Sequence, residues 1–145
     1  MRRTHTVLAV LFAVGGLNAC TTVDLRPACP ATAEGPPVLD QPFQLRHGAT
    51  AVLRDANLSL RFSRLVQDSR CPPGAQCIWE GMAQIELVAR QTPGAAQRIA
   101  LDTQARQNAP YGPYDLTLSG LMPRPLQGVP VSEGDYCATL RVTRR

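Results

Sequence analysis

Apolar and polar residues alternate with a period of two along much of the chain after residue 42. In the stretch LSLRF, Leu58, Leu60 and Phe62 fall on one face, and the intervening Ser59 and Arg61 fall on the other. Such alternation is typical of a β-strand that buries one face. The same pattern predicts strands over residues 82–90 and 136–144, and shorter strands over 43–45, 50–53, 98–101 and 115–118.

Glycine and proline interrupt the pattern between these segments, at 47–49, 72–74, 93–94, 110–113 and 123–134. No segment has the 3.6-residue period of an amphipathic helix. Several short strands separated by turn residues favour an antiparallel sandwich or barrel over a helical or α/β fold. We therefore expect an all-β protein: a small antiparallel β-sandwich, or barrel-like domain, of about seven strands that is stapled by disulfides.

The N-terminus has a different character. Arg2 and Arg3 precede an apolar run over residues 7–17, VLAVLFAVGGL. This run is too short for a membrane span, which needs about 20 apolar residues, but it suits the hydrophobic region of a signal peptide.

The apolar run ends in LNAC, residues 17–20. This stretch resembles the lipobox of bacterial lipoproteins, in which the cysteine carries palmitate and other acyl chains and becomes the mature N-terminus. The resemblance implies a signal peptide over 1–19 and lipidation of Cys20. Because Thr21 rather than aspartate follows, it also implies anchoring in the bacterial outer membrane, facing the periplasm.

Removing 19 of the 145 residues leaves 126, enough for one domain with a core. Residues 20–41, rich in Pro, Ala and Thr, are expected to form a lipidated tether, and 42–145 the β-sandwich-like domain. The net charge of +4 falls to about +2 without the signal peptide's two arginines. Because basic residues do not cluster with aromatic ones, we expect no nucleic-acid partner.

Apart from Cys20, the chain has four cysteines: Cys29, Cys71, Cys77 and Cys137. An even number in an exported protein predicts two disulfides, with three possible pairings. A proline-glycine turn separates Cys71 from Cys77, which makes them the natural pair and leaves Cys29 with Cys137. Cys137 falls on the polar face of its strand, outside the expected core, where a tether could reach it.

Catalytic and metal chemistry have little support. After signal removal the only histidine is His47, expected as a solvated turn residue with no nucleophile beside it. The spacing of Cys71 and Cys77 fits neither a zinc site nor a redox C-x-x-C pair. Asp68 and Glu80 could supply oxygen ligands to a metal. The simpler interpretation is that Asp68 caps a turn and that Glu80 is a solvated residue at the end of a strand. We therefore expect no catalytic residue, no metal and no cofactor.

Two non-catalytic readings of the stretch DSRCPPGAQCIWEG, residues 68–81, stay open. In the first, it is a recognition loop with an exposed tip at Gly74, Ala75 and Gln76, and with Trp79 as a binding hot spot if exposed. In the second, it is a stapled corner with Trp79 packed on the core or the disulfide. For Trp79 we favour burial. The candidate recognition residues are Arg70, Pro72, Pro73, Gly74, Ala75, Gln76 and Trp79.

Residues 58–88 resemble a group of uncharacterised bacterial secreted and lipid-anchored proteins that share a D-S-R-C-P-x4-C-x-W-x-G motif between two strands. The matching positions are Asp68, Ser69, Arg70, Cys71, Pro72, Cys77, Trp79 and Gly81. The resemblance supports the fold, the compartment and the Cys71–Cys77 unit, and implies no activity. Asp68 and Arg70 are expected to pair or to cap the corner, as a surface salt bridge worth less than about 1 kcal/mol.

Together these features predict a non-enzymatic, lipid-anchored envelope protein with a binding or structural role. Its expected partners are the membrane, through Cys20, and possible envelope proteins. The leading alternative is an inhibitor that inserts the 71–77 loop into an envelope enzyme. A hydrolase is the third reading, since two of the eleven acidic residues could meet in space.

Overall fold

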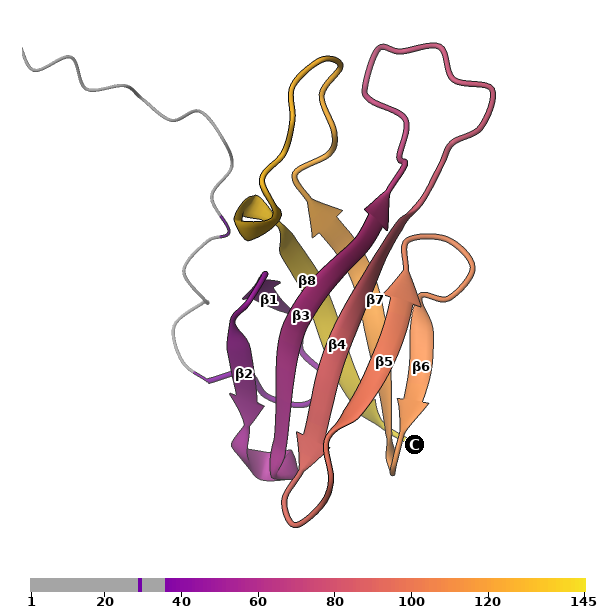
Figure 1. Cartoon of the computed structure of the whole chain (residues 1–145). Helices are drawn as coiled ribbons and strands as arrows, with labels where there is room; N and C mark the ends of the chain where they lie inside the picture. The colour runs from indigo at the N-terminus through magenta and orange to yellow at the C-terminus, as the bar shows by residue number, and fades with distance from the viewer. Residues whose placement is uncertain (1–28, 30–35) are drawn as a thin grey trace, which may run out of the picture.

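A computed structural model describes residue 29 and residues 36–145 (Figure 1). This part of the chain forms eight β-strands and two short 3₁₀ helices, with no α-helix. The strands are β1 (Phe43–Arg46), β2 (Thr50–Leu53), β3 (Leu58–Asp68), β4 (Ala83–Gln91), β5 (Gln97–Asp102), β6 (Asn108–Tyr111), β7 (Tyr114–Met122) and β8 (Cys137–Arg144). The 3₁₀ helices are η1 (Arg54–Ala56) and η2 (Glu133–Asp135).

The strands form two four-stranded antiparallel sheets that pack face to face. One sheet has the order β1-β8-β7-β6 and the other β2-β3-β4-β5. The predicted β-sandwich is therefore confirmed. No helix in residues 36–145 is long and apolar enough to cross a membrane.

The alternating residues of the central strands fill the space between the sheets. Over their regular stretches, β3, β4, β7 and β8 turn every second side chain inward, and these inward residues are almost completely buried. The largest fully buried side chains are Leu45, Leu53, Leu58, Leu60, Phe62, Ile85, Leu87, Leu101, Leu116, Leu118, Leu140 and Val142. Burial of a side chain of this size contributes roughly 1.5–3 kcal/mol, so this layer supplies most of the driving force for folding.

Two features of the strands differ from the sequence-based prediction. The strand that begins at Leu58 continues to Asp68 through two register irregularities, at Phe62/Arg64 and Leu65/Gln67. These shifts break the period of two, which is why its second half shows no alternation. The additional strand, β6, contains Pro110, which marked the segment as a gap. β6 lies at a sheet edge, where a proline without an N–H group is tolerated.

Both predicted disulfides are present, Cys71–Cys77 and Cys29–Cys137, with Cα–Cα distances of 6.0 and 5.3 Å. Cys137 lies outside the main core cluster, as the alternation predicted, and so does Cys29. Each is nevertheless buried, so Cys137 does not lie on an exposed polar face. This bond fixes residue 29 to the first residue of β8.

Two long loops project from one end of the sandwich, which we call the loop end (Figure 1). It carries the β3–β4 loop (69–82) and the β7–β8 loop (123–136), seen at the top of Figure 1. The register places Cys137 opposite Met122, the last residue of β7, so the Cys29–Cys137 disulfide also lies here.

Candidate recognition surface at the loop end

The base of the β3–β4 loop continues the hairpin of its two strands. The Ser69 N–H donates to the Met82 carbonyl at 2.8 Å, and the Cys71 N–H donates to the Glu80 carbonyl at 2.9 Å. Gly81 permits this close pairing, because a Cβ there would stand 1.8 Å from the Ser69 carbonyl oxygen. Its φ of +65° is also left-handed, which disfavours other residues. The motif glycine is therefore a structural requirement of the loop base.

Arg70 and Asp68 form a bidentate ion pair at this base. Arg70 Nε donates to Asp68 Oδ1 at 2.8 Å, and an Arg70 terminal nitrogen donates to Asp68 Oδ2 at 2.7 Å. The two side chains are 7% and 6% exposed. The predicted pairing is confirmed, but the prediction of a surface salt bridge is wrong: this is a buried pair, with the larger energies that apply to buried charges.

The same pair connects the loop to the opposite sheet. The Arg70 guanidinium donates to the Leu121 carbonyl at 2.5 Å and to the Pro123 carbonyl at 2.7 Å, at the end of β7. The Tyr136 hydroxyl, just before β8, donates to Asp68 Oδ2 at 2.9 Å. Asp68 and Arg70 of the D-S-R sequence therefore connect the β3–β4 loop to the β7–β8 loop through hydrogen bonds, and we call this connection the lock. Arg70 is part of this lock and not an exposed recognition residue, contrary to its expected role.

The network shifts the pKa of both acidic groups in it. Burial alone would raise the pKa of Asp68, but its hydrogen bonds to Arg70, the positive charge of Arg70 and the Tyr136 hydroxyl together lower it below its usual value. Burial and the neighbouring Asp68 carboxylate raise the pKa of Tyr136 to about 12. At neutral pH the carboxyl is therefore ionised and the phenol protonated, as the hydrogen bonds require.

Beyond this base the loop projects into solvent, closed by the Cys71–Cys77 disulfide. Of the tip residues, Pro73, Gly74 and Gln76 are exposed, whereas Pro72 and Ala75 are partly covered. The Ala75 N–H donates to the Pro72 carbonyl at 3.1 Å, so the tip is a defined turn.

Trp79 lies on the outside of this loop, 81% exposed, and the adjacent Ile78 is 92% exposed. Our preference for a buried Trp79 is therefore wrong. The core is already filled by strand residues, and the β3–β4 hairpin base carries residues 78 and 79 beyond the end of both sheets. The exposure of Ile78 was not anticipated, although its place between Cys77 and Trp79 in the same loop could have suggested it.

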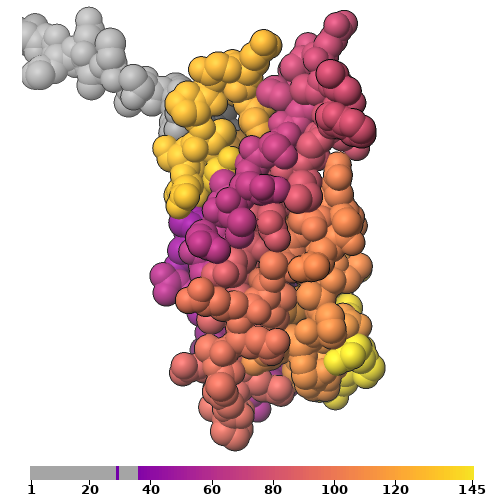
Figure 2. All heavy atoms as spheres, turned by 45° about the vertical axis from the view of Figure 1, so that its right-hand side comes forward, coloured from indigo at the N-terminus to yellow at the C-terminus, as the bar shows by residue number. Residues whose placement is uncertain are grey.

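The neighbouring β7–β8 loop also exposes apolar side chains. Leu126 and Val129 are 57% and 47% exposed, and a turn joins them, in which the Val129 N–H donates to the Leu126 carbonyl at 3.1 Å. Figure 2 shows the two loops projecting side by side beyond the sandwich, the β3–β4 loop in magenta and the β7–β8 loop in yellow-orange. The sequence pattern recorded this second segment only as a gap rich in glycine and proline.

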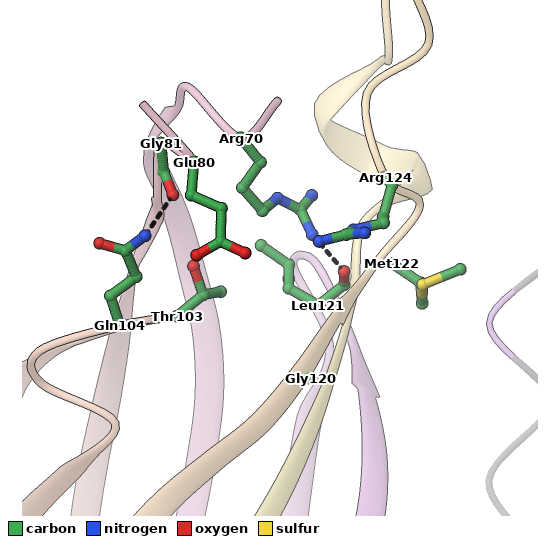
Figure 3. A pocket seen from close by; sticks show the side chains of 9 residues that line it. All are labelled: Arg70, Glu80, Gly81, Thr103, Gln104, Gly120, Leu121, Met122 and Arg124. Atoms are coloured by element: carbon green, nitrogen blue, oxygen red, sulfur yellow. Dashed lines mark hydrogen bonds between the residues drawn. The ribbon is translucent and has the colours of Figure 1, made fainter. Parts of the chain in front are cut away.

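A cleft of about 290 Å³ lies below the two loops, between the sheets (Figure 3). Its lining residues are Arg70, Glu80, Gly81, Thr103, Gln104, Gly120, Leu121, Met122 and Arg124. Gln104 donates to the Gly81 carbonyl at 2.7 Å and closes one side. Figure 3 shows the Glu80 side chain pointing into the cleft toward Thr103, while Arg124 reaches toward Arg70 on the other side.

His47 is not the solvated turn residue that we expected. It does lie in a turn, but its side chain is 18% exposed and packs edge-on against Phe62, with ring centroids 5.2 Å apart. Its Nε2 lies 3.9 Å from a Glu133 carboxylate oxygen. The apolar contact with Phe62 accounts for its position.

The remaining site predictions are placed as follows. The predicted lipidation site Cys20 and the predicted signal peptide over 1–19 lie outside the described residues. The Asp68 carboxylate does more than cap a turn, because Arg70 and Tyr136 donate to its oxygens, and Glu80 is exposed just before β4. Within residues 36–145 and Cys29, no three His, Cys, Asp or Glu side chains are grouped as a metal site would need.

Comparison with known proteins adds no identity: the chain matches no protein-family model, no curated protein and no solved structure at a significant level. The loop end must therefore be interpreted from its own geometry.

Proposed function

We propose that the chain is a lipid-anchored, non-catalytic binding protein of the bacterial envelope, which faces the periplasm and binds through its loop end. The observation that carries the proposal is the exposure of Ile78 and Trp79 on a loop fixed at its base. Large apolar side chains held in water mark interaction sites, and tryptophan is the residue most enriched at binding hot spots. A loop already fixed in shape loses little conformational entropy on binding.

The compartment rests on independent features. The two disulfides fit an oxidising environment such as the periplasm. The LNAC stretch resembles a lipobox, and the motif from Asp68 to Gly81 resembles that of bacterial secreted and lipid-anchored proteins. Lipidation at Cys20 and the outer-membrane location are part of this proposal.

The chemistry of the cleft favours binding over catalysis. Hydrolysis of a glycosidic bond uses two carboxyl groups, and the lining supplies one, from Glu80. The guanidinium of Arg70, which also lines the cleft, is engaged by Asp68 and two backbone carbonyls. General acid–base catalysis by a histidine has no candidate in the lining.

Site-specific photocrosslinking in intact bacteria tests the proposal. A photoreactive phenylalanine derivative replaces Trp79 in one strain and Val52, a 49% exposed residue on β2, in a matched control strain. We expect light-dependent adducts with another envelope component from position 79 and none from position 52. Adducts from neither position, or equal adducts from both, would contradict binding through the loop end.

An inhibitor of an envelope enzyme is the second candidate, because the clamped tip exposes Gly74 and Gln76. In that case the adducts should form from position 76 and contain one enzyme, and Gln76→Arg should abolish inhibition while Val52→Arg should not. Adducts that form from position 79 but not from position 76 would reject the inhibitor.

A further inference from the structure

The tips of the two loops combine an absence of charge with exposed large apolar side chains. Residues 71–79 (CPPGAQCIW) and 125–131 (PLQGVPV) contain no charged residue, whereas 18% of the whole chain is charged. About three charged residues would be expected in these sixteen positions. We call the two segments the apolar tips. Their exposed large side chains are Ile78, Trp79, Leu126 and Val129.

The apolar tips lie together at the loop end. Arg70 joins the bases of both loops through its hydrogen bonds to the Leu121 and Pro123 carbonyls. Figure 1 shows the loops next to one another and extending past the strands, and Figure 2 shows both projecting from the same end of the molecule. The two apolar tips therefore project from the same end of the sandwich, on loops that are joined at their bases (Figure 1).

The Cys29–Cys137 disulfide limits how far the loop end can lie from Cys20. The Cys29–Cys137 disulfide fixes Cys29 at the loop end, opposite the end of β7. Cys20 precedes Cys29 by nine residues. Nine residues span at most about 30 Å when fully extended. A lipid on Cys20 would therefore keep the loop end within about 30 Å of the bilayer.

We propose that the apolar tips dock into the interfacial region of the bilayer that holds the lipid anchor. This inference rests on the proposed anchoring at Cys20 and names the partner of the loop end. Tryptophan favours the membrane interface, where its ring is apolar and its N–H can find polar partners. A projecting, uncharged tip can enter that layer without desolvating a charge, a cost that a charged residue would incur.

The charged residues nearest in sequence to the apolar tips lie at the bases of the two loops. Arg124 is exposed just inside the second tip, and no carboxylate among the described residues lies within ion-pair distance of it. A lipid phosphate at the level of the headgroups could act as its counter-ion. Glu80, which follows Trp79, is also exposed, and the side chains of Glu80 and Arg124 both line the cleft (Figure 3).

The protein's single tryptophan makes the inference directly measurable. The processed full chain, purified from bacterial membranes, is reconstituted with an excess of phosphatidylethanolamine–phosphatidylglycerol vesicles, with and without brominated phosphatidylcholine. We expect a blue shift of Trp79 emission on the vesicles, several-fold weaker quenching by aqueous acrylamide, and strong quenching by the brominated lipid. Unchanged emission and unchanged acrylamide quenching at vesicle excess would overturn the inference.

A matched pair of variants tests whether the second tip takes part. Val129→Asp places a charge in the second tip, at a residue that is 47% exposed. Val52→Asp places a charge on β2, at a residue that is 49% exposed. We expect Val129→Asp to lose most of the bromolipid quenching of Trp79 and Val52→Asp to retain it. Equal retention by both variants would contradict joint docking of the two apolar tips.

Anchoring and docking are distinguished in the same samples. The mass of the N-terminal peptide reports lipid on Cys20, and flotation reports vesicle association. A lipidated chain that floats while Trp79 remains open to acrylamide refutes docking and keeps the anchor. An unmodified chain whose Trp79 is quenched by bromolipid refutes the anchor and keeps docking. If Trp79 is instead shielded only when envelope proteins are added to the vesicles, the partner is a protein and the inference is wrong.

Discussion

Replacing Arg70 by methionine should be among the most damaging changes outside the hydrophobic core. Methionine keeps much of the apolar bulk of arginine, so the change chiefly removes the charge and its hydrogen bonds. The Asp68 carboxylate, 6% exposed, would lose its bidentate partner, and the Leu121 and Pro123 carbonyls would lose a donor each. Removing one member of a buried pair typically costs about 3–5 kcal/mol.

That loss is large relative to the stability of a small domain, typically about 5–15 kcal/mol. It should lower Tm by about 10–20 °C. Urea unfolding with the disulfides intact, followed by far-ultraviolet circular dichroism, measures it. Trp79 fluorescence is a poor probe here, because the side chain is already exposed in the folded state.

Two controls isolate the buried charge as the cause. Arg64→Met removes an exposed partner of Glu86, 3.6 Å away, and should cost less than about 1 kcal/mol. The double variant Asp68→Asn/Arg70→Met should be more stable than Arg70→Met alone, because it no longer buries an uncompensated carboxylate. An Arg70→Met cost equal to that of Arg64→Met would refute the account of the buried ion pair.

Three further predictions follow from the loop base. Gly81→Ala should be strongly destabilising, because the added Cβ would clash with the Ser69 carbonyl. Gly74 has open space around it, so Gly74→Ala should cost only the roughly 1 kcal/mol of a left-handed backbone conformation. Equal losses of stability for the two variants in urea unfolding would contradict this difference. Folding lowers the pKa of Asp68 from 3.8, so the stabilisation that the ionised carboxylate provides is present above that pH and is lost as the pH falls. The difference in unfolding free energy between wild type and Asp68→Asn should therefore shrink below about pH 4. A difference that stays constant with pH would contradict this role of the Asp68 carboxylate. Folding raises the pKa of Tyr136 from 10.0 to about 12, so the stabilisation that the protonated hydroxyl provides is complete below pH 10 and is lost between about pH 10 and 12. An alkaline titration of phenolate absorbance should show a step near pH 12, and Tyr136→Phe should remove that step.

The fold could be predicted because burial of one face imposes a period of two on each strand. Residues 83–89 on β4 alternate without interruption, so their strand was evident from the sequence. The pattern failed where the backbone departs from regular pairing. The irregularities in β3 hid its second half, and Pro110 in the edge strand β6 imitated a loop.

The candidate site was harder to predict because it depends on contacts between distant segments. The spacing of Cys71 and Cys77 gave the disulfide, but nothing local shows that Arg70 reaches the Leu121 and Pro123 carbonyls, about fifty residues away. The exposure of Trp79 likewise depends on where the hairpin base directs the loop. The signal of the second tip in the sequence was the presence of Leu126 and Val129 in a loop segment, 125–131, that has no charged residue.

The central claim is that Trp79 is exposed to water on a loop whose base is fixed by hydrogen bonds. Its most direct test is acrylamide quenching of the tryptophan fluorescence of the oxidised protein in dilute solution, without lipid. Because Trp79 is the only tryptophan, the whole signal belongs to this position. We expect a quenching constant for the folded protein close to that of the urea-unfolded chain, together with a high fluorescence anisotropy that falls on unfolding. A blue-shifted emission with weak quenching in the folded protein would place Trp79 in an apolar environment and contradict the account.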